Sequence, residues 1–210
     1  MRQNKTYGLV LIASSVVLVV MGVTHPGRLP STREALEHTG LIAAIAHSLA
    51  IMGVWLAFWG LAGLSRFLGL DRPMVVGALI AFVVPAAAVS VAAALDGFVV
   101  PKLALQALDA DDVTRNSMHS LIGFCVLVAS SLTRIYMLLG AVAIAMLSWV
   151  VRERQLSRGL PMLGALVALA AIGTTFGGPA YISVHMVLLL ALVQSAWMVW
   201  AGMMLIRQPG

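Results

Sequence analysis

The sequence predicts an all-α membrane protein, a six-helix bundle in which residues 1–210 form a single integral membrane domain. The first observation is composition: 61% of the residues are apolar and only 10% are charged. A typical soluble domain carries about 25% charged residues. Because so little polar surface cannot cover a water-soluble globule, the lipid bilayer is the expected solvent. The composition also excludes intrinsic disorder, which requires few apolar residues.

The second observation is a series of six apolar segments, each near the length that crosses a hydrocarbon core of about 30 Å. They cover residues 7–24, 41–65, 74–96, 117–151, 161–177 and 182–206. The first follows a short basic start and resembles a signal peptide. No A-x-A-like cleavage site follows it, so we expect it to be retained as the first transmembrane helix.

The fourth segment is 35 residues long and contains Arg134 near its middle. One interpretation is a single long helix whose first turns project outside the membrane. The other is two short spans with a turn at residues 130–134, which would give seven crossings. The single helix is preferred, because the turn would contain neither glycine nor proline and would move Arg152, Arg154 and Arg158 to the outer side.

The third observation is the distribution of positive charge, which orients the helices. With the N-terminus inside, eight basic residues fall in inner segments and four in outer ones. The inner ones are Arg2, Lys5, Arg66, Arg72, Arg152, Arg154, Arg158 and Arg207, and the outer ones are Arg28, Arg33, Lys102 and Arg115. This bias predicts a multi-pass protein of a bacterial-type plasma (inner) membrane with both termini in the cytoplasm.

The remaining elements follow in order along the chain. Pro85 is expected to kink the third helix. In the outer loop at 98–116, residues 102–108 suit a short interfacial helix, and Asp111 or Asp112 suits a helix cap. Small residues such as Gly173 and Gly177 predict close helix packing, which could also serve a homo- or hetero-oligomer.

A possible internal repeat divides the chain into three helical hairpins. Each returning helix begins with a similar group: Ala46-His47-Ser48-Leu49, Met118-His119-Ser120-Leu121 and Val184-His185-Met186-Val187. Repeats of this kind underlie many transporter folds. Chance matches are also common in membrane helices, which use few residue types, so the duplication stays open.

The histidines form the candidate site. His47, His119 and His185 lie at or just inside the outer ends of the second, fourth and sixth helices, and Asp96 ends the third at the same depth. Neutral imidazoles and a carboxylate are common ligands of transition metals, and two histidines on facing helices can ligate haem iron. The alternative is that histidine simply suits the membrane interface. His25 and His38 are expected to be ordinary loop residues.

Two further polar residues lie within spans. Arg134 is a candidate for binding an anionic headgroup, a haem propionate or an anionic substrate, although it could also snorkel to the interface. Gln194 in the last helix is a candidate for ligand binding or for joining helices.

The function stays open between three hypotheses. The first is a metal or haem protein with a redox or assembly role at the outer face. The others are a small-solute transporter or channel, and a non-catalytic subunit of a membrane complex. The sequence has no serine-nucleophile, Walker or dinucleotide-binding signature. The single cysteine, Cys125, excludes an intrachain disulfide, and no Lys/Arg tract suggests nucleic-acid binding.

Overall fold

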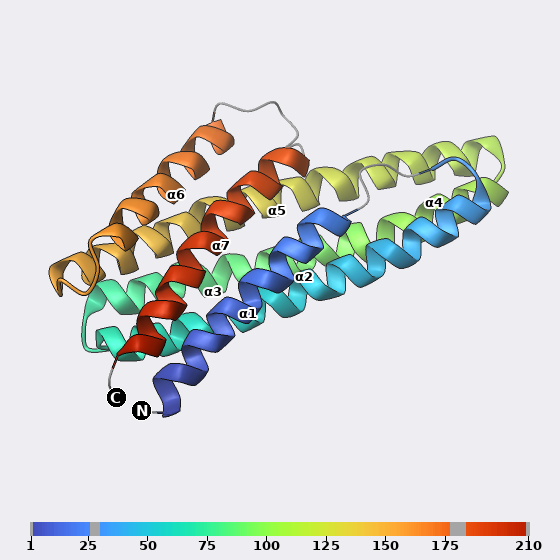
Figure 1. Cartoon of the computed structure of the whole chain (residues 1–210). Coiled ribbons are helices and arrows are strands. Elements are labelled where there is room, and N and C mark those ends of the chain that lie inside the picture. The colour runs from blue at the N-terminus through green and yellow to red at the C-terminus, as the bar shows by residue number, and fades with distance from the viewer. Residues whose placement is uncertain (1, 26–29, 177–183, 209–210) are drawn as a thin grey trace.

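Figure 1 shows a computed structural model that describes residues 2–25, 30–176 and 184–208, all of whose regular elements are helices. The elements are α1 (Arg2–Thr24), α2 (Arg33–Leu68), α3 (Pro73–Ala94), a π-helical turn η1 (Leu95–Val99), α4 (Val100–Asp109), α5 (Asp112–Glu153), α6 (Gly159–Phe176) and α7 (Val184–Arg207). The all-α prediction is confirmed.

Within the described residues, six helices are long and apolar enough to cross a membrane. They are α1, α2, the continuous rod of α3, η1 and α4, then α5, α6 and α7. The N-terminal end of α1 and the C-terminal end of α7 lie close together at the same end of the bundle (Figure 1). The chain is therefore a multi-pass helical membrane protein, whose outward-facing apolar side chains contact lipid.

The fourth apolar segment is one helix. α5 runs for 42 residues without interruption, so a turn at residues 130–134 is wrong. A helix of this length extends about 63 Å, roughly twice the hydrocarbon thickness. Its first turns run beside α4 and the start of α2, and this part of the molecule extends beyond α1, α6 and α7 (Figure 1).

The third helix continues further than its apolar segment indicated. Instead of ending at residue 96, it passes through η1 directly into α4, which contains the short helix expected at 102–108. The chain then turns at Asp111, whose side chain caps α5 by accepting a hydrogen bond from the Thr114 amide at 2.9 Å. This bond lowers the pKa of the Asp111 carboxyl. Arg115 closes the turn by donating to the backbone oxygens of Ala107 and Ala110.

The hydrophobic core is concentrated in the half of the bundle that contains the chain termini. α1 packs against α2 and α7, while α3 and α6 each pack against α5. The largest fully buried side chains include Leu64, Phe82, Leu147, Trp197 and Leu205, all from this half. Gly8 of α1 and Gly202 of α7 allow the closest approach, because a Cβ on Gly8 would lie 2.5 Å from the Gly202 oxygen. The opposite half is packed less tightly and contains the site described below.

A buried hydrogen bond joins α5 to α7 in this core. The Trp197 indole donates to the Ser148 hydroxyl at 2.9 Å, and both side chains are buried. Gly164 of α6 packs directly over this pair: a Cβ there would collide with the Ser148 side chain and lie 3.3 Å from the indole nitrogen. Gly173, two and a half turns later on α6, has open space at the same position, and Gly177 lies outside the described residues.

We expect Gly164→Ala to destabilise the protein by about 1–3 kcal/mol, because the added methyl forces the Ser148–Trp197 pair apart. Gly173→Ala is the matched control and should be neutral or stabilising by up to about 1 kcal/mol, the helix-propensity gain of alanine. Thermal unfolding of both variants in the same detergent checks this. Equal midpoints for the two variants would show that α6 does not pack as described.

Candidate metal centre

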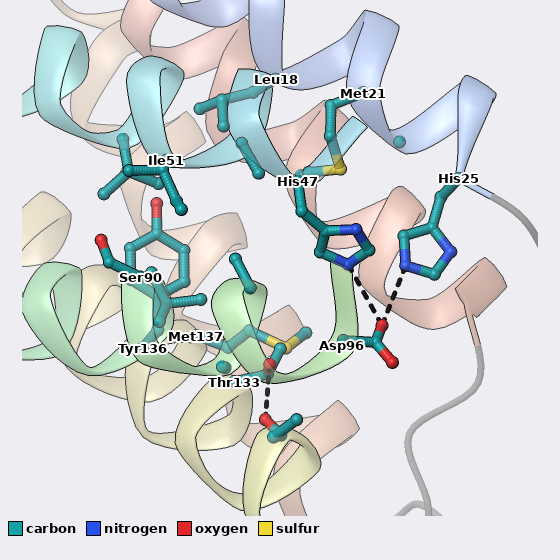
Figure 2. A pocket seen from close by; sticks show the side chains of 18 of the residues that line it. Leu18, Met21, His25, His47, Ile51, Ser90, Asp96, Thr133, Tyr136 and Met137 are labelled. Carbon is teal, nitrogen blue, oxygen red and sulfur yellow. Dashed lines mark hydrogen bonds and ion pairs between the residues drawn. The ribbon is translucent and has the colours of Figure 1, made fainter. Parts of the chain in front are cut away.

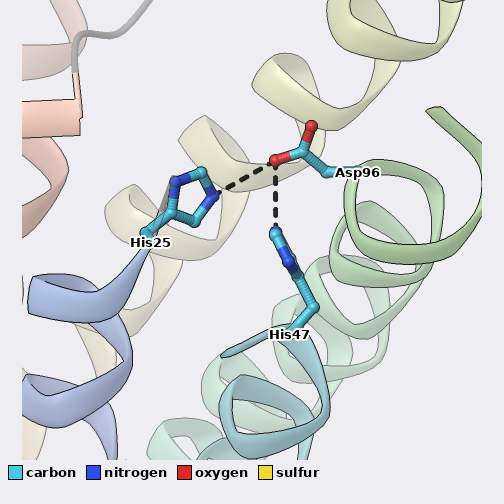
Figure 3. Close-up of side chains that lie close together, drawn as sticks. All are labelled: His25, His47 and Asp96. Atoms are coloured by element: carbon cyan, nitrogen blue, oxygen red, sulfur yellow. Dashed lines mark hydrogen bonds and ion pairs between the residues drawn. The ribbon is translucent and has the colours of Figure 1, made fainter. Parts of the chain in front are cut away.

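Three ligand-type side chains from separate segments of the chain meet at one point in the less tightly packed half. His25 follows α1, His47 belongs to α2 and Asp96 belongs to η1. Both imidazole Nε2 atoms approach the same carboxylate oxygen, Asp96 Oδ2, at 3.3 Å from His25 and 3.1 Å from His47 (Figure 3). One ligand atom from each residue lies within 4.8 Å of the other two. Among the described residues, no other such group of three His, Cys, Asp or Glu side chains is found.

His47 is held in place by its own helix. Its side chain is only 7% exposed. Its Nδ1 bonds to the Ala43 carbonyl oxygen, one turn earlier, at 2.7 Å. Because a carbonyl can only accept, Nδ1 carries the proton and a neutral His47 presents the lone pair of Nε2 to Asp96. A backbone carbonyl behind the imidazole is the usual support of a metal-binding histidine.

Asp96 is positioned by the π-helical turn. A π turn contains one more residue than an α turn, and such turns are frequent at functional sites. Gly97 makes this position possible, because a Cβ there would lie 2.5 Å from His47 Cβ and 2.7 Å from its Cγ. The absence of a side chain at Gly97 thus lets η1 approach α2 closely enough for the Asp96 carboxylate to meet the imidazole.

His25 completes the group from the first residue beyond α1. Its side chain is 22% exposed, and its ring meets the His47 ring edge to face with centroids 4.8 Å apart. Its Nδ1 is buried without a hydrogen-bond partner in the described part of the chain. Asp96 is the most exposed member, at 35%. The group is therefore reached from one side and closed on the other by α2.

The contact between His47 and Asp96 requires a second proton or a cation, whereas a neutral His25 can donate an Nε2–H to the carboxylate. Since Nδ1 of His47 already holds a proton, the contact between Nε2 and Oδ2 is favourable only when a second proton or a cation lies there. Two ligands bound at 2.0–2.1 Å to a tetrahedral ion lie roughly 3.3 Å apart. The two separations from Asp96 Oδ2, 3.1 and 3.3 Å, are near that value, and all three ligand atoms lie within 4.8 Å of one another.

A cavity of about 430 Å³ extends from this group into the bundle. Figure 2 shows His25, His47 and Asp96 at one end, with Ser90 and Tyr136 further along. Helices α1, α2, α3, α5 and α7 all contribute to its wall, which is mainly apolar. Two buried polar atoms on that wall, Ser130 Oγ and Gln194 Nε2, have no hydrogen-bond partner among the residues that the structure describes. Buried polar atoms are normally paired, so these two indicate that water or a ligand occupies the cavity.

The structure brings two of the predicted site residues together, His47 and Asp96. His119 is exposed on the projecting part of α5 and does not belong to the group. His185 falls at the start of α7, where its side chain lies outside the described part of the chain. Arg134 is half-buried on α5 and does not line the cavity, whereas Gln194 is buried and does.

His25 is the member that sequence reasoning missed, because it was assigned to an ordinary loop. One signal could have found it: His25 directly follows the first apolar segment, at the same predicted depth as Asp96. The other expected loop histidine, His38, is exposed on the first turns of α2. Comparisons with protein-family models, with curated proteins and with solved structures gave no match.

Proposed function

We propose that this protein binds one divalent transition-metal ion through His25, His47 and Asp96. The observation that carries the proposal is the convergence of the three ligand atoms within 4.8 Å of one another. The ligands come from three separate segments of the chain, the residue after α1, α2 and η1, so their meeting is a product of the fold. The Ala43 carbonyl behind His47 fixes its tautomer, as expected for a metal ligand.

The ligand set favours zinc or iron over haem. Two imidazole nitrogens and one carboxylate oxygen suit Zn²⁺ or Fe²⁺ and leave at least one coordination position open. A haem ligated by both histidines would place its ring between the two Nε2 atoms. Asp96 Oδ2, at 3.1 and 3.3 Å from those atoms, stands in that space.

The open position gives the ion a chemical role. Structural metal sites are closed by four protein ligands, whereas an open position accepts water or another molecule. Here the ion would lie at the end of the cavity, so that its open side can face a guest held there. This arrangement favours a binding or catalytic centre over a purely scaffolding subunit.

The metal centre is proposed to face the non-cytosolic side of a bacterial-type inner membrane. The charge bias of the connecting segments supports this orientation, because basic residues gather at the end of the bundle opposite to the site. The turn between α5 and α6 should therefore lie in the cytoplasm, so a reporter enzyme that works only in the cytoplasm should be active when fused after Gln155. If instead only a reporter that works outside the cytoplasm were active there, the orientation would be reversed.

Metal analysis tests the proposal directly. Protein purified without chelator should contain about one zinc or iron ion per chain, measured by plasma mass spectrometry. After chelator treatment, adding back the ion at 100 times its Kd should stabilise the fold by about 2.7 kcal/mol and raise the unfolding midpoint. Protein that never retains an ion, and whose midpoint no divalent ion shifts, would show that the group shares a proton instead.

A further inference from the structure

The cavity has a form that suits a chain-like guest. Its wall on α5 reaches from Val126 to Met137 and its wall on α2 from Ala43 to Val54, each a length of about 16 Å. It thus extends about 16 Å along the helix axes, the direction in which lipid chains lie in a bilayer. Its volume of about 430 Å³ is within the range of ligand pockets.

The charge of the metal group at the end of the cavity indicates which polar group the guest would carry. A divalent ion bound by two neutral imidazoles and one carboxylate keeps a net charge of about +1. In a low-dielectric site this charge attracts an anion much more strongly than it would in water. A carboxylate supplies that charge and an oxygen for the open coordination position.

We infer that the cavity binds a single-chain lipid carboxylate, with the carboxylate on the metal ion and the alkyl chain along the cavity towards Gln194. This inference rests on the proposed metal centre. The carboxylate matches the end of the cavity at the metal group, and the alkyl chain matches the mainly apolar wall, where Ser130 and Gln194 are polar exceptions. The chain also lies parallel to the lipids from which it enters.

Two alanines of α7 provide a matched pair for the test. Ala191 lines the cavity, whereas Ala196 faces outward and is exposed. Phenylalanine at 191 fills space that the alkyl chain needs, while phenylalanine at 196 adds the same bulk on the lipid-facing surface. Neither residue belongs to the metal group, so both variants should bind metal like the parent protein.

The experiment uses the full chain, loaded with Co²⁺ in phosphatidylcholine nanodiscs, and follows the visible Co²⁺ spectrum during addition of oleate. The parent and Ala196→Phe should show a saturable change that ends near one oleate per chain. In Ala191→Phe the half-saturating oleate concentration should rise about tenfold or more, equivalent to about 1.4 kcal/mol. Acetate, which has no long chain, should act equally on all three proteins.

The outcomes separate the two proposals. A parent protein that binds no Co²⁺ overturns the metal centre itself. Bound Co²⁺ with a spectrum that oleate leaves unchanged overturns the lipid site alone. If Ala191→Phe does not fold, Ala129→Leu narrows the same cavity from α5. An unchanged oleate response in a folded cavity variant would also overturn the lipid site.

Discussion

His47→Ala is expected to weaken metal binding by about 100-fold or more. The substitution removes a buried ligand, and loss of even an outer-shell partner typically costs 10–100-fold. It also removes the imidazole that lies 3.1 Å from Asp96 Oδ2, so the contact that positions this second ligand is lost. Competition between the protein and a metal-binding dye measures the affinity.

His119→Ala is the matched control for this experiment. His119 is exposed on α5, outside the metal group, so its removal should leave the affinity within about twofold of the parent value. A large loss of affinity in His119→Ala would favour a site built from the repeated helix starts. An unaffected His47→Ala would contradict the group at Asp96.

Gly97→Ala is expected to disrupt the site without removing any ligand. The new methyl would lie 2.5 Å from His47 Cβ and 2.9 Å from Nδ1, the atom that bonds to the Ala43 carbonyl. Relief of this contact requires η1 and α2 to separate. We expect about 1–3 kcal/mol of destabilisation from overpacking and a 10–100-fold weaker metal affinity from misplacement of the two ligands.

Gly123→Ala provides the control for the glycine substitution. This residue lies on α5, and a Cβ there would meet nothing within 4 Å. It should keep the parent affinity and gain up to about 1 kcal/mol of stability from helix propensity. Indistinguishable metal affinities in Gly97→Ala and Gly123→Ala would show that the close approach of η1 to α2 is not required.

The helices could be predicted from sequence because a bilayer imposes a simple condition on length and polarity. Backbone groups in lipid must be paired within the segment, so each long apolar run becomes a helix. This condition does not determine where a helix ends once it has left the hydrocarbon. η1 and α4 continue the third span beyond residue 96, because a helix that leaves the hydrocarbon can continue with polar residues such as Lys102.

The site was only partly predictable. The sequence indicates how deep in the membrane a residue lies more readily than whether its side chain faces the bundle or the lipid. His47 and His119 occur in similar short groups, yet one is buried and the other exposed. The long α5 begins beyond α1, α6 and α7 (Figure 1), so His119 does not share the surroundings of His47. His25 lies beyond a helix end, where the path of the chain depends on tertiary contacts.

The surplus residue in η1 has a mechanical consequence for the end of the molecule beyond the site. One residue more or less turns everything that follows by about 100°. α4 presents its buried residues Val100, Pro101 and Ala107 to the bundle only while η1 keeps its wide turn. Rewinding that turn would swing Asp109 away from Arg33, 2.5 Å from it at the tip of α2. The Arg33–Asp109 contact at the far tip therefore depends on the same wide turn that positions Asp96.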